Sequence, residues 1–546
     1  MSAVRPSDPV LDGPTGGPAH RRSRGTSRRA EPRWLWLTGL TVAGLQAVLL
    51  VGYSTHIYSH FDLTIDFAIF NQAWSLIAHG HLDPYSTLNP YNYPHYGYPY
   101  WSDHFELIMW PMALLWYLYP HSIDLLFVQD LATAGSTLVA FLFVLDLLAA
   151  RAARTAQVTR RLVGTVTVGD LLALFALALL VINPWVYWAA SFDFHLEAVA
   201  TLFLLLAARD LWNGHRRRSL WWIVGVLLCG NVAATYLAGL GISLAIARRD
   251  LRWSGAGLVG LGVAWSLGVN AIGGGVGTII GGNYGYLAGP SAGANPSIVA
   301  IAKGALLHPS RPYGMLRSRW LWNYRMLASS GLVGVVSGLG FGVAFVVLVA
   351  NGLNAAAVFS GPISSFQALP VYYFVTVGTV AVLLWMIRSA HRVLRWIAGV
   401  LVVAVLAQAV VLSVVWIPRA RTEFLVVGGA AAGRLARAEA GIPADAEVIA
   451  SQGVIGRFAN RVAIYPFLDL DDGGQIIPVS ADTVEFVLST AGIEYATTAG
   501  TLTAVSYLEH HGARLVSQGD GVYVLVWHPR PGTHRLTLPA TPPPPG

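Results

Sequence analysis

The chain alternates long apolar runs with short connections rich in arginine, and this pattern predicts a bundle of membrane-spanning helices. Several runs approach the roughly 20 residues that a helix needs to cross a bilayer. No small-residue cleavage site follows the first run, so we interpret it as a retained anchor and not as a removed signal peptide. The runs expected to form full spans are 34–53, 123–149, 170–188, 255–272, 371–387 and 394–417.

Shorter or broken apolar runs predict further membrane-associated segments. The run 107–119 is interrupted by proline and should form a short helix at the membrane edge. A returning helix is expected before His215, and the run 220–247 fits two short passes that break near Gly230. A further pair of apolar segments is expected within 331–358.

Five regions depart from the pattern of spans. Polar loops are expected at about 54–122 and 273–330, a disordered basic tail at 1–33, and a flexible Pro-rich tail at 529–546. The region 419–528 alternates short strand-like runs with helix-like stretches, which predicts a small α/β domain. Its expected strands are 447–450, 461–465, 484–489 and 522–527, and its expected helix is 502–511.

Composition supports the same fold class, an all-α polytopic membrane protein of residues 34–418 followed by that small α/β domain. The 546 residues are 55% hydrophobic and 12% charged, with a mean hydropathy of +0.54, which is too apolar for a soluble globular protein. The net charge of +7 comes with arginines that sit in short connections, so nucleic-acid binding is not needed to explain it. The single cysteine excludes a disulfide framework and a thiolate metal site.

The positions of the arginines predict the orientation in the plasma membrane. Arginine clusters at 21–29, 151–161, 216–218 and 388–395 place those segments inside, so the N-terminus should be cytoplasmic and the C-terminal domain extracytoplasmic. By the same count the loop 273–330 is external although it is basic. Either the count is wrong by one crossing, or these arginines are held outside for a purpose, which is the interpretation we favour.

The loop after the first span carries acids interleaved with aromatic residues, which suits chemistry on a sugar attached to a lipid carrier. We expect Asp66 to act as a catalytic base, since it follows the first span directly. Asp62, one helical turn earlier, would share its face if the stretch is helical, and two close carboxylates can raise one pKa or hold a divalent ion. The alternative is that both acids cap or solvate a surface helix.

Two acid–histidine pairs are expected on the external face. Asp103 and His104 in the first loop, with Asp193 and His195 in the next external connection, offer oxygen and imidazole ligands suited to a divalent cation such as Mg or Mn. No spacing rule for a defined metal site is met, and the two connections would have to converge. The alternative is that His104 and His195 are interfacial side chains hydrogen-bonded to helix ends.

Basic and aromatic residues are candidates for binding the substrate. Arg311, Arg317, Arg319 and Arg325 could hold a carrier phosphate, because guanidinium groups match phosphate oxygens. Tyr98 and Trp101 end a tyrosine-rich run that could form a platform for a sugar. The alternatives are contact of the arginines with lipid headgroups and an interfacial aromatic belt.

Three blocks of sequence carry a resemblance to a known family. The blocks are Asp66-Phe-Ala-Ile-Phe-Asn-Gln72 with Trp74, Gly80 and Ser102-Asp103-His104-Phe105; Phe194-His195; and Ile442-Pro-Ala-Asp-Ala-Glu-Val-Ile-Ala-Ser451 with Arg461-Val-Ala-Ile-Tyr465. Through them the chain, from about residue 34 to 528, resembles an uncharacterised family of predicted bacterial and archaeal membrane proteins, domain of unknown function 2079.

That family is similar in architecture to the GT-C glycosyltransferases. The resemblance implies a GT-C-like helical bundle, a large first external loop with a catalytic acid, and a lipid-phosphate-linked sugar as donor. The chain departs from the family at two positions, with Asn71 where an acid is common and Asn231 where a charged residue often sits. The roles of those two positions therefore do not carry over.

Together these features predict a membrane glycosyltransferase that moves a sugar from a polyprenyl-phosphate donor to an extracytoplasmic glycan, lipid or protein of the cell envelope. The alternative is a non-enzymatic transporter, flippase-like passage or scaffold for lipid-linked intermediates. A transporter should carry ionisable residues near the bilayer midplane, whereas the acids here concentrate in loops. The C-terminal domain is expected to cover the site or select the acceptor, with Asp469, Asp471 and Asp472 as a solvated loop.

Overall fold

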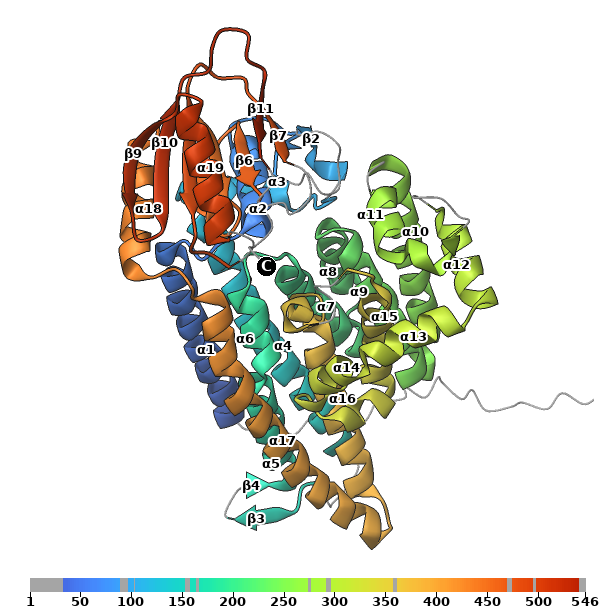
Figure 1. The fold of residues 1–546 in the computed structure, drawn as a ribbon. Helices are drawn as coiled ribbons and strands as arrows, with labels where there is room; N and C mark the ends of the chain where they lie inside the picture. The colour runs from blue at the N-terminus through green and yellow to red at the C-terminus, as the bar shows by residue number, and fades with distance from the viewer. Residues whose placement is uncertain are drawn as a thin grey trace, which may run out of the picture.

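The computed structural model is a helical bundle with a small mixed sheet at one end (Figure 1). It describes residues 33–88, 97–102, 104–152, 158–163, 166–273, 276–290, 296–356, 361–468, 474–493 and 497–539. The helices are α1 (Arg33–His60), α2 (Ile65–Ala78), α3 (Met109–Met112), α4 (Ile123–Ala152), α5 (Val168–Ile182), α6 (Pro184–Ser191), α7 (Glu197–Trp212), α8 (Arg216–Leu228), α9 (Asn231–Ala247), α10 (Arg252–Gly273), α11 (Val276–Tyr284), α12 (Ile298–Leu307), α13 (Ser310–Ser318), α14 (Trp320–Ala328), α15 (Gly338–Leu353), α16 (Leu369–Arg388), α17 (Arg392–Phe424), α18 (Gly429–Gly441) and α19 (Thr498–His510). The strands are β1 (Tyr85–Ser86), β2 (Tyr98–Pro99), β3 (Arg161–Val163), β4 (Val166–Thr167), β5 (Glu447–Ser451), β6 (Ile464–Phe467), β7 (Gln475–Pro478), β8 (Val484–Ser489), β9 (Arg514–Gly519), β10 (Val522–Trp527) and β11 (Arg535–Leu538).

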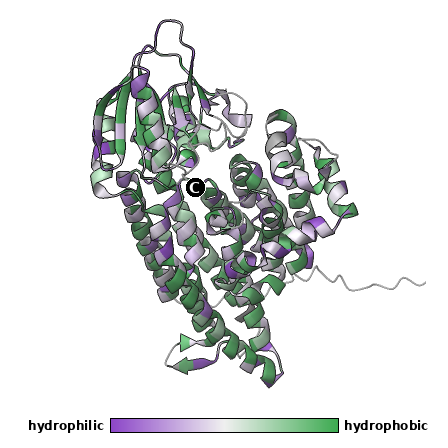
Figure 2. Ribbon diagram, in the orientation of Figure 1, coloured by the Kyte–Doolittle hydropathy of each residue, from purple (hydrophilic) through white to green (hydrophobic). Residues whose placement is uncertain are grey.

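The bundle confirms the prediction of a polytopic helical protein. Within the described residues, 6 helical segments are long and apolar enough to cross a membrane, and Figure 2 shows hydrophobic residues along the helices on the far side from the sheet. The segments are Arg33–His60, Ile123–Ala150, Val168–Ser191, Arg249–Ile272, Leu369–Arg388 and Arg392–Phe424. Each contains one of the runs expected to span, so apolar length alone located them.

The expected break in the run 220–247 is confirmed. Helix α8 ends at Leu228 and α9 begins at Asn231, and Gly230 between them has φ 108°, a left-handed conformation that favours glycine. A side chain at this glycine would also collide with the side chain of Glu106. The backbone therefore turns here because glycine permits both the conformation and the contact.

One expectation for the middle of the chain is wrong. The apolar pair expected within 331–358 is one helix, α15, preceded by the short 3-10 helix η6 (Leu332–Val336). Glycines in this stretch pack directly on the backbones of α9 and α16, so their lack of side chains reflects close helix packing and not a turn between two passes. The stretch 273–330, expected as a loop between spans, contains α11 to α14 in the part that is described.

The C-terminal region confirms the expected α/β architecture. Its main sheet has the strand order β6-β5-β8-β10-β9. Strand β5 runs parallel to both of its neighbours, β6 and β8. Strand β10 runs antiparallel to both of its neighbours, β8 and β9. Residues such as Ile449, Phe486 and Leu525 pack with Leu508 of α19 in a separate core. Strands β8 and β10 have the predicted bounds, whereas the edge strand β9 was missed because most of its side chains are exposed and it lacks apolar alternation.

The sheet is tied to the bundle through α2. The short 3-10 helix η9 (Ile455–Ala459) packs on α2, where Gly456 N donates to Leu63 O at 3.0 Å and Asn71 Nδ2 donates to Gly456 O at 3.0 Å. Gln72 Nε2 donates to the backbone oxygen of Val462 at 3.1 Å. Helix α2 is thus held between the spanning helices and the C-terminal sheet, at the end of the bundle where the sheet lies.

Candidate functional site

Helix α2 presents one acid on an otherwise buried segment. Thr64 caps its N-terminus, with its hydroxyl accepting a hydrogen bond from Asp66 N at 3.4 Å. Every residue of α2 is buried except Asp66, whose side chain is 41% exposed. A carboxylate in the first turn is favoured by the partial positive charge of the helix N-terminus. The helix therefore delivers a single ionisable group to an accessible position.

His195 is the partner of this acid. Its Nε2 lies 3.8 Å from Asp66 Oδ2, and its Nδ1 lies 3.1 Å from Phe192 O. The imidazole stacks on Phe366 with ring centroids 3.7 Å apart. Burial lowers the pKa of His195, but the Asp66 carboxylate and two further acids outweigh it, so the pKa is raised. Asp66 is thus the main cause of the raised pKa of His195.

Gln129 of α4 holds the segment that carries His195. Its Oε1 accepts a hydrogen bond from His195 N at 2.6 Å, and its Nε2 donates to Asp193 O at 2.9 Å. Asp193, the first residue of this turn, has φ 45°, a left-handed conformation that aspartate tolerates better than most side chains. The amide of one buried glutamine therefore fixes both ends of the turn.

Asp193 positions α2 from outside that helix. Its buried carboxylate accepts hydrogen bonds from Thr64 N at 2.9 Å, from Phe67 N at 3.3 Å and from the hydroxyl of Thr64. Burial, with a contribution from nearby Asp66, raises the pKa of Asp193 to about 6. These donors occupy the carboxylate at the N-terminus of α2, so in this structure Asp193 orients Asp66.

Asp62 lies in the connection before α2 and does not share a helical face with Asp66. The expected shared face required a helix through both residues, but α2 begins only after the Thr64 cap. Asp62 Oδ1 accepts hydrogen bonds from Val426 N at 3.0 Å and Val427 N at 2.9 Å, and the residue is fully buried. Burial raises its pKa to about 6, although these hydrogen bonds oppose the shift. Asp62 thus ties the first loop to the connection between α17 and α18.

A second acid–histidine group faces the first across Phe70. His104 Nδ1 lies 3.5 Å from Glu106 Oε1, and Tyr100 OH donates to Glu106 Oε2 at 2.8 Å. The Phe70 ring centroid is 5.1 Å from that of His104 and 6.4 Å from that of His195. The two connections that carry His104 and His195 therefore converge, as the sequence required for a common site.

Glu197 links the two groups, and the sequence reasoning gave it no role. Glu197 is the first residue of α7, and its carboxyl group is buried. This carboxyl interacts electrostatically with His195, Glu106 and His104. Glu106, Gln129 and Phe366 were missed as well. Glu106 and Glu197 follow the acid–histidine pairs closely in sequence, a signal that could have found them. Gln129 and Phe366 belong to other elements, and nothing in their local sequence points to His195.

The proposed metal site stays a prediction. Asp103 lies outside the described residues, and Asp193 is occupied at the start of α2. Among the residues that the structure does describe, no group of 3 or more His, Cys, Asp or Glu side chains is placed to hold a metal ion. His104 and His195 are the two of the four expected ligands whose rings approach the same residue, Phe70.

The other predicted substrate-binding residues have local partners. Arg311 Nη1 donates to Leu287 O at 3.1 Å, and the buried Arg319 donates to Asn351 O at 3.0 Å and to a second backbone oxygen. Arg317 is exposed on α13. Two of the three arginines thus bind backbone oxygens of the α11 to α15 region.

The predicted aromatic platform is only partly exposed. Tyr98 is buried in β2, and the Trp101 ring is half-buried, with its centroid 5.1 Å from that of Tyr100 and 5.2 Å from that of Trp110. The remaining tyrosines of this run, at 91, 93 and 96, lie outside the described residues, as do Asp469, Asp471 and Asp472. What these two rings do in the structure is pack the loop that carries His104.

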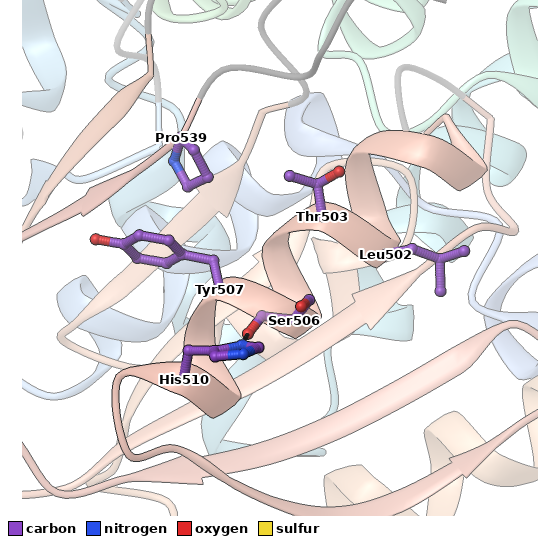
Figure 3. A pocket seen from close by; sticks show the side chains of 6 residues that line it. All are labelled: Leu502, Thr503, Ser506, Tyr507, His510 and Pro539. Atoms are coloured by element: carbon purple, nitrogen blue, oxygen red, sulfur yellow. Dashed lines mark hydrogen bonds between the residues drawn. The ribbon is translucent and has the colours of Figure 1, made fainter.

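A shallow hollow of about 520 Å³ lies on the C-terminal domain and shares no residue with this site. Figure 3 shows its lining, which comes from one face of α19 and from Pro539. His510 there is bonded through Nδ1 to Ser506 O at 2.6 Å, within its own helix. A much narrower space lies behind the His195 ring, lined by Gln129, Thr133, Ala189, Ala198, Phe366 and Leu369.

Comparisons with known proteins give a family and a similar solved structure. The family described as Predicted membrane protein (DUF2079) matches residues 58–500. The crystal structure of ArnT from Cupriavidus metallidurans bound to undecaprenyl phosphate is similar at 12% identity and a TM-score of 0.42, over 88% of this chain and 97% of that one. A search of curated proteins found no match.

Proposed function

Because the chain belongs to the DUF2079 family of predicted membrane proteins, we propose that it acts at a membrane surface, as a glycosyltransferase with a polyprenyl-phosphate-linked sugar as donor. The observation that carries the proposal is Asp66, the one accessible residue of a buried helix, placed beside a buried histidine whose pKa it raises.

In the proposed reaction Asp66 is the general base. Its carboxylate accepts the proton of an acceptor hydroxyl as the hydroxyl oxygen forms a bond to the anomeric carbon of the sugar. The bond between that carbon and the phosphate oxygen breaks, and the polyprenyl phosphate leaves with the electron pair. His195, whose pKa is raised by the Asp66 carboxylate, is the ionisable neighbour of this base, with its Nε2 at 3.8 Å from Asp66 Oδ2.

The departing phosphate needs a positive partner. A divalent cation, Mg or Mn, would serve through His104 and Asp103, and arginine side chains would serve without a metal. Glu106 and Glu197 beside the histidines add negative charge that favours a cation at this place. Which of the two partners acts is decided by measuring transfer with and without a chelator.

We also propose that the sheet and Asp66 face the outside of the cell, where the acceptor would be a glycan, lipid or protein of the envelope. The β3–β4 hairpin and the turn between α16 and α17 lie at the end of the bundle opposite the sheet (Figure 1). Strand β3 of the hairpin begins at Arg161, and the turn lies between Arg388, the last residue of α16, and Arg392, the first residue of α17. Arginine-rich connections are typical of the cytoplasmic side, which supports a cytoplasmic N-terminus.

One observation favours the alternative of a passage for a lipid-linked intermediate. Asp130 is fully buried in α4, and neither of its carboxylate oxygens has a hydrogen-bond partner among the described residues. Buried atoms of Gln46 and Ser54 in α1, the helix packed against α4, also lack partners there. An ionisable group at membrane depth is typical of transport proteins.

The two functions separate in one reconstitution experiment. Full-length protein in liposomes would receive a panel of undecaprenyl-phosphate-linked sugars with a cell-envelope fraction as acceptor. We expect label from one donor to appear in the acceptor with stoichiometric release of undecaprenyl phosphate. The alternative result is movement of intact donor across the bilayer without release of undecaprenyl phosphate. If this movement is lost in Asp130→Asn and retained in Asp66→Asn, the protein is a passage for the lipid-linked intermediate and not a glycosyltransferase.

A further inference from the structure

A pair of arginines shares one tryptophan near the sheet-side end of α17. The guanidinium carbon of Arg419 lies 4.8 Å from the Trp416 ring centroid, and that of Arg325 lies 5.5 Å from the same centroid. Arg325 also lies 5.0 Å from the Trp322 ring. Cation–π contacts of this kind hold a guanidinium in place and leave its N–H donors available.

These cations have no anionic partner in the described part of the chain. Every ion pair found there involves other arginines or histidines, and neither guanidinium donates a hydrogen bond to a described residue. Glu423, one helical turn beyond Arg419, is exposed and forms no ion pair with it in these residues. Two positive charges therefore lie within 5.5 Å of one ring centroid, that of Trp416, and no described residue accepts a hydrogen bond from them.

The pair sits above an apolar lateral face. Trp416 belongs to the candidate span Arg392–Phe424, and the α17 side chains one and two turns before Arg419, Val415 and Val411, are 41% and 62% exposed. On the facing helix α14, Trp320 is 60% exposed. An apolar face of a spanning helix contacts lipid, so the arginines lie where acyl chains meet a headgroup.

We propose that Arg325 and Arg419, held by Trp322 and Trp416, form a docking site for the phosphate of a membrane lipid, with the lipid chain along the exposed valines of α17. Guanidinium groups bind phosphate oxygens through paired N–H donors and are weakly hydrated, which suits a bilayer edge. An unpaired cation near the hydrocarbon region is costly, and a phosphate removes that cost. The charge and the apolar face select a lipid phosphate over a neutral lipid.

This docking site is distinct from the Asp66 site but is joined to it by aromatic contacts. Ring centroids follow one another from Trp416 to Trp188 at 5.9 Å, to Phe424 at 5.2 Å, to Phe192 at 5.6 Å and to His195 at 5.3 Å. A lipid phosphate bound at the arginines would thus be separated from His195 by this series of rings and would not contact the catalytic residues. The inference goes beyond the proposed function, because binding at this place requires no transfer reaction.

The test is a binding measurement on full-length protein in a phosphate-free detergent, with undecaprenyl phosphate, undecaprenol and inorganic phosphate as separate probes. We expect undecaprenyl phosphate to raise the unfolding temperature at concentrations where the other two have no effect. The double variant Arg325→Gln/Arg419→Gln should weaken this binding by at least about tenfold, since each lost charge-assisted contact alone is worth about that factor. The matched control Arg392→Gln/Arg395→Gln, at the other end of α17, should bind like the unaltered protein.

Each other outcome decides against the site. Equal protection by undecaprenol would show an apolar groove only, equal protection by inorganic phosphate would show a free-phosphate site, and unchanged binding in the double variant would place the lipid elsewhere. If the glutamine variant does not fold, Arg325→Lys/Arg419→Lys keeps the charge and must still lose several-fold affinity, because lysine lacks the paired donors. Asp66→Asn should bind normally, so failure of the transfer proposal leaves this result interpretable.

Discussion

Asp66 at the start of α2 and Asp62 in the connection before it are the same residue type in adjacent segments, yet they have opposite environments. The Asp66 side chain is 41% exposed and has a histidine at 3.8 Å, whereas Asp62 is fully buried and accepts two backbone hydrogen bonds. An accessible carboxylate can take a proton from a substrate, whereas a fully buried one that accepts two backbone hydrogen bonds can only hold the fold together. We therefore propose a catalytic role for Asp66 and a structural role for Asp62.

The largest effect should come from Asp66→Asn. The amide keeps the shape of the side chain but cannot accept a proton, so transfer should fall by about 10² to 10⁴ with insertion and unfolding temperature unchanged. Radiolabel transfer from a lipid-linked sugar measures the first quantity and thermal unfolding the second. Asp83→Asn, at an exposed acid of the same loop, is the matched control and should retain full activity.

Asp62→Ala should reverse that pattern. It leaves the N–H groups of Val426 and Val427 without their buried acceptor, at a cost of about 2 to 3 kcal/mol, and should loosen the C-terminal region. Thermal unfolding and limited proteolysis between α17 and α18 would detect the change. Rapid proteolysis of the Asp66 variant with an intact Asp62 variant would contradict the assignment.

Asp62→Asn provides a finer form of the same test. The amide oxygen can still accept both hydrogen bonds, while the ionisable group is gone. Because the folded pKa of Asp62 is raised from 3.8 to about 6, its contribution to stability is greatest below the ordinary value and is lost as the pH rises to about 6. The asparagine variant should therefore show a flatter dependence of unfolding temperature on pH between about 4 and 6.

His195→Gln should give a smaller loss of transfer, about tenfold, because Asp66 loses the ionisable neighbour that lies 3.8 Å away. The raised pKa of His195 means that its pairing with Asp66 stabilises the fold at low pH and that this contribution is lost as the pH rises through the raised value. A pH–rate profile should lose its alkaline limb in the variant. An unchanged profile would show that His195 does not titrate in the active range.

Thr64→Val should have the smallest effect. It removes the hydroxyl that caps α2 and donates to Asp193, so we expect a loss of about 1 kcal/mol in stability with less than a tenfold change in rate. Thermal unfolding measures the loss of stability, and the transfer assay measures the change in rate. A rate loss as large as that of Asp66→Asn would mean that the position of the helix, and not the carboxylate, limits the reaction.

Sequence reasoning located the spans and the strands β8 and β10 because apolar length and alternation are local signals. It missed the single helix α15, whose glycines serve packing against α9 and α16 and look like a break in the chain. In the site it selected Asp66 and His195 but gave them separate roles, since their approach depends on Gln129 of another helix. Asp62 was grouped with Asp66 through helical spacing, which the Thr64 cap invalidates.

The most direct measurement is a double-mutant cycle of Asp66→Asn and His195→Gln in the lipid-linked-sugar transfer assay. If the two residues act as one unit, the double variant is no slower than Asp66→Asn alone, because the histidine acts only through the carboxylate. Near-normal transfer by Asp66→Asn, or losses that multiply in the double variant, would contradict the account.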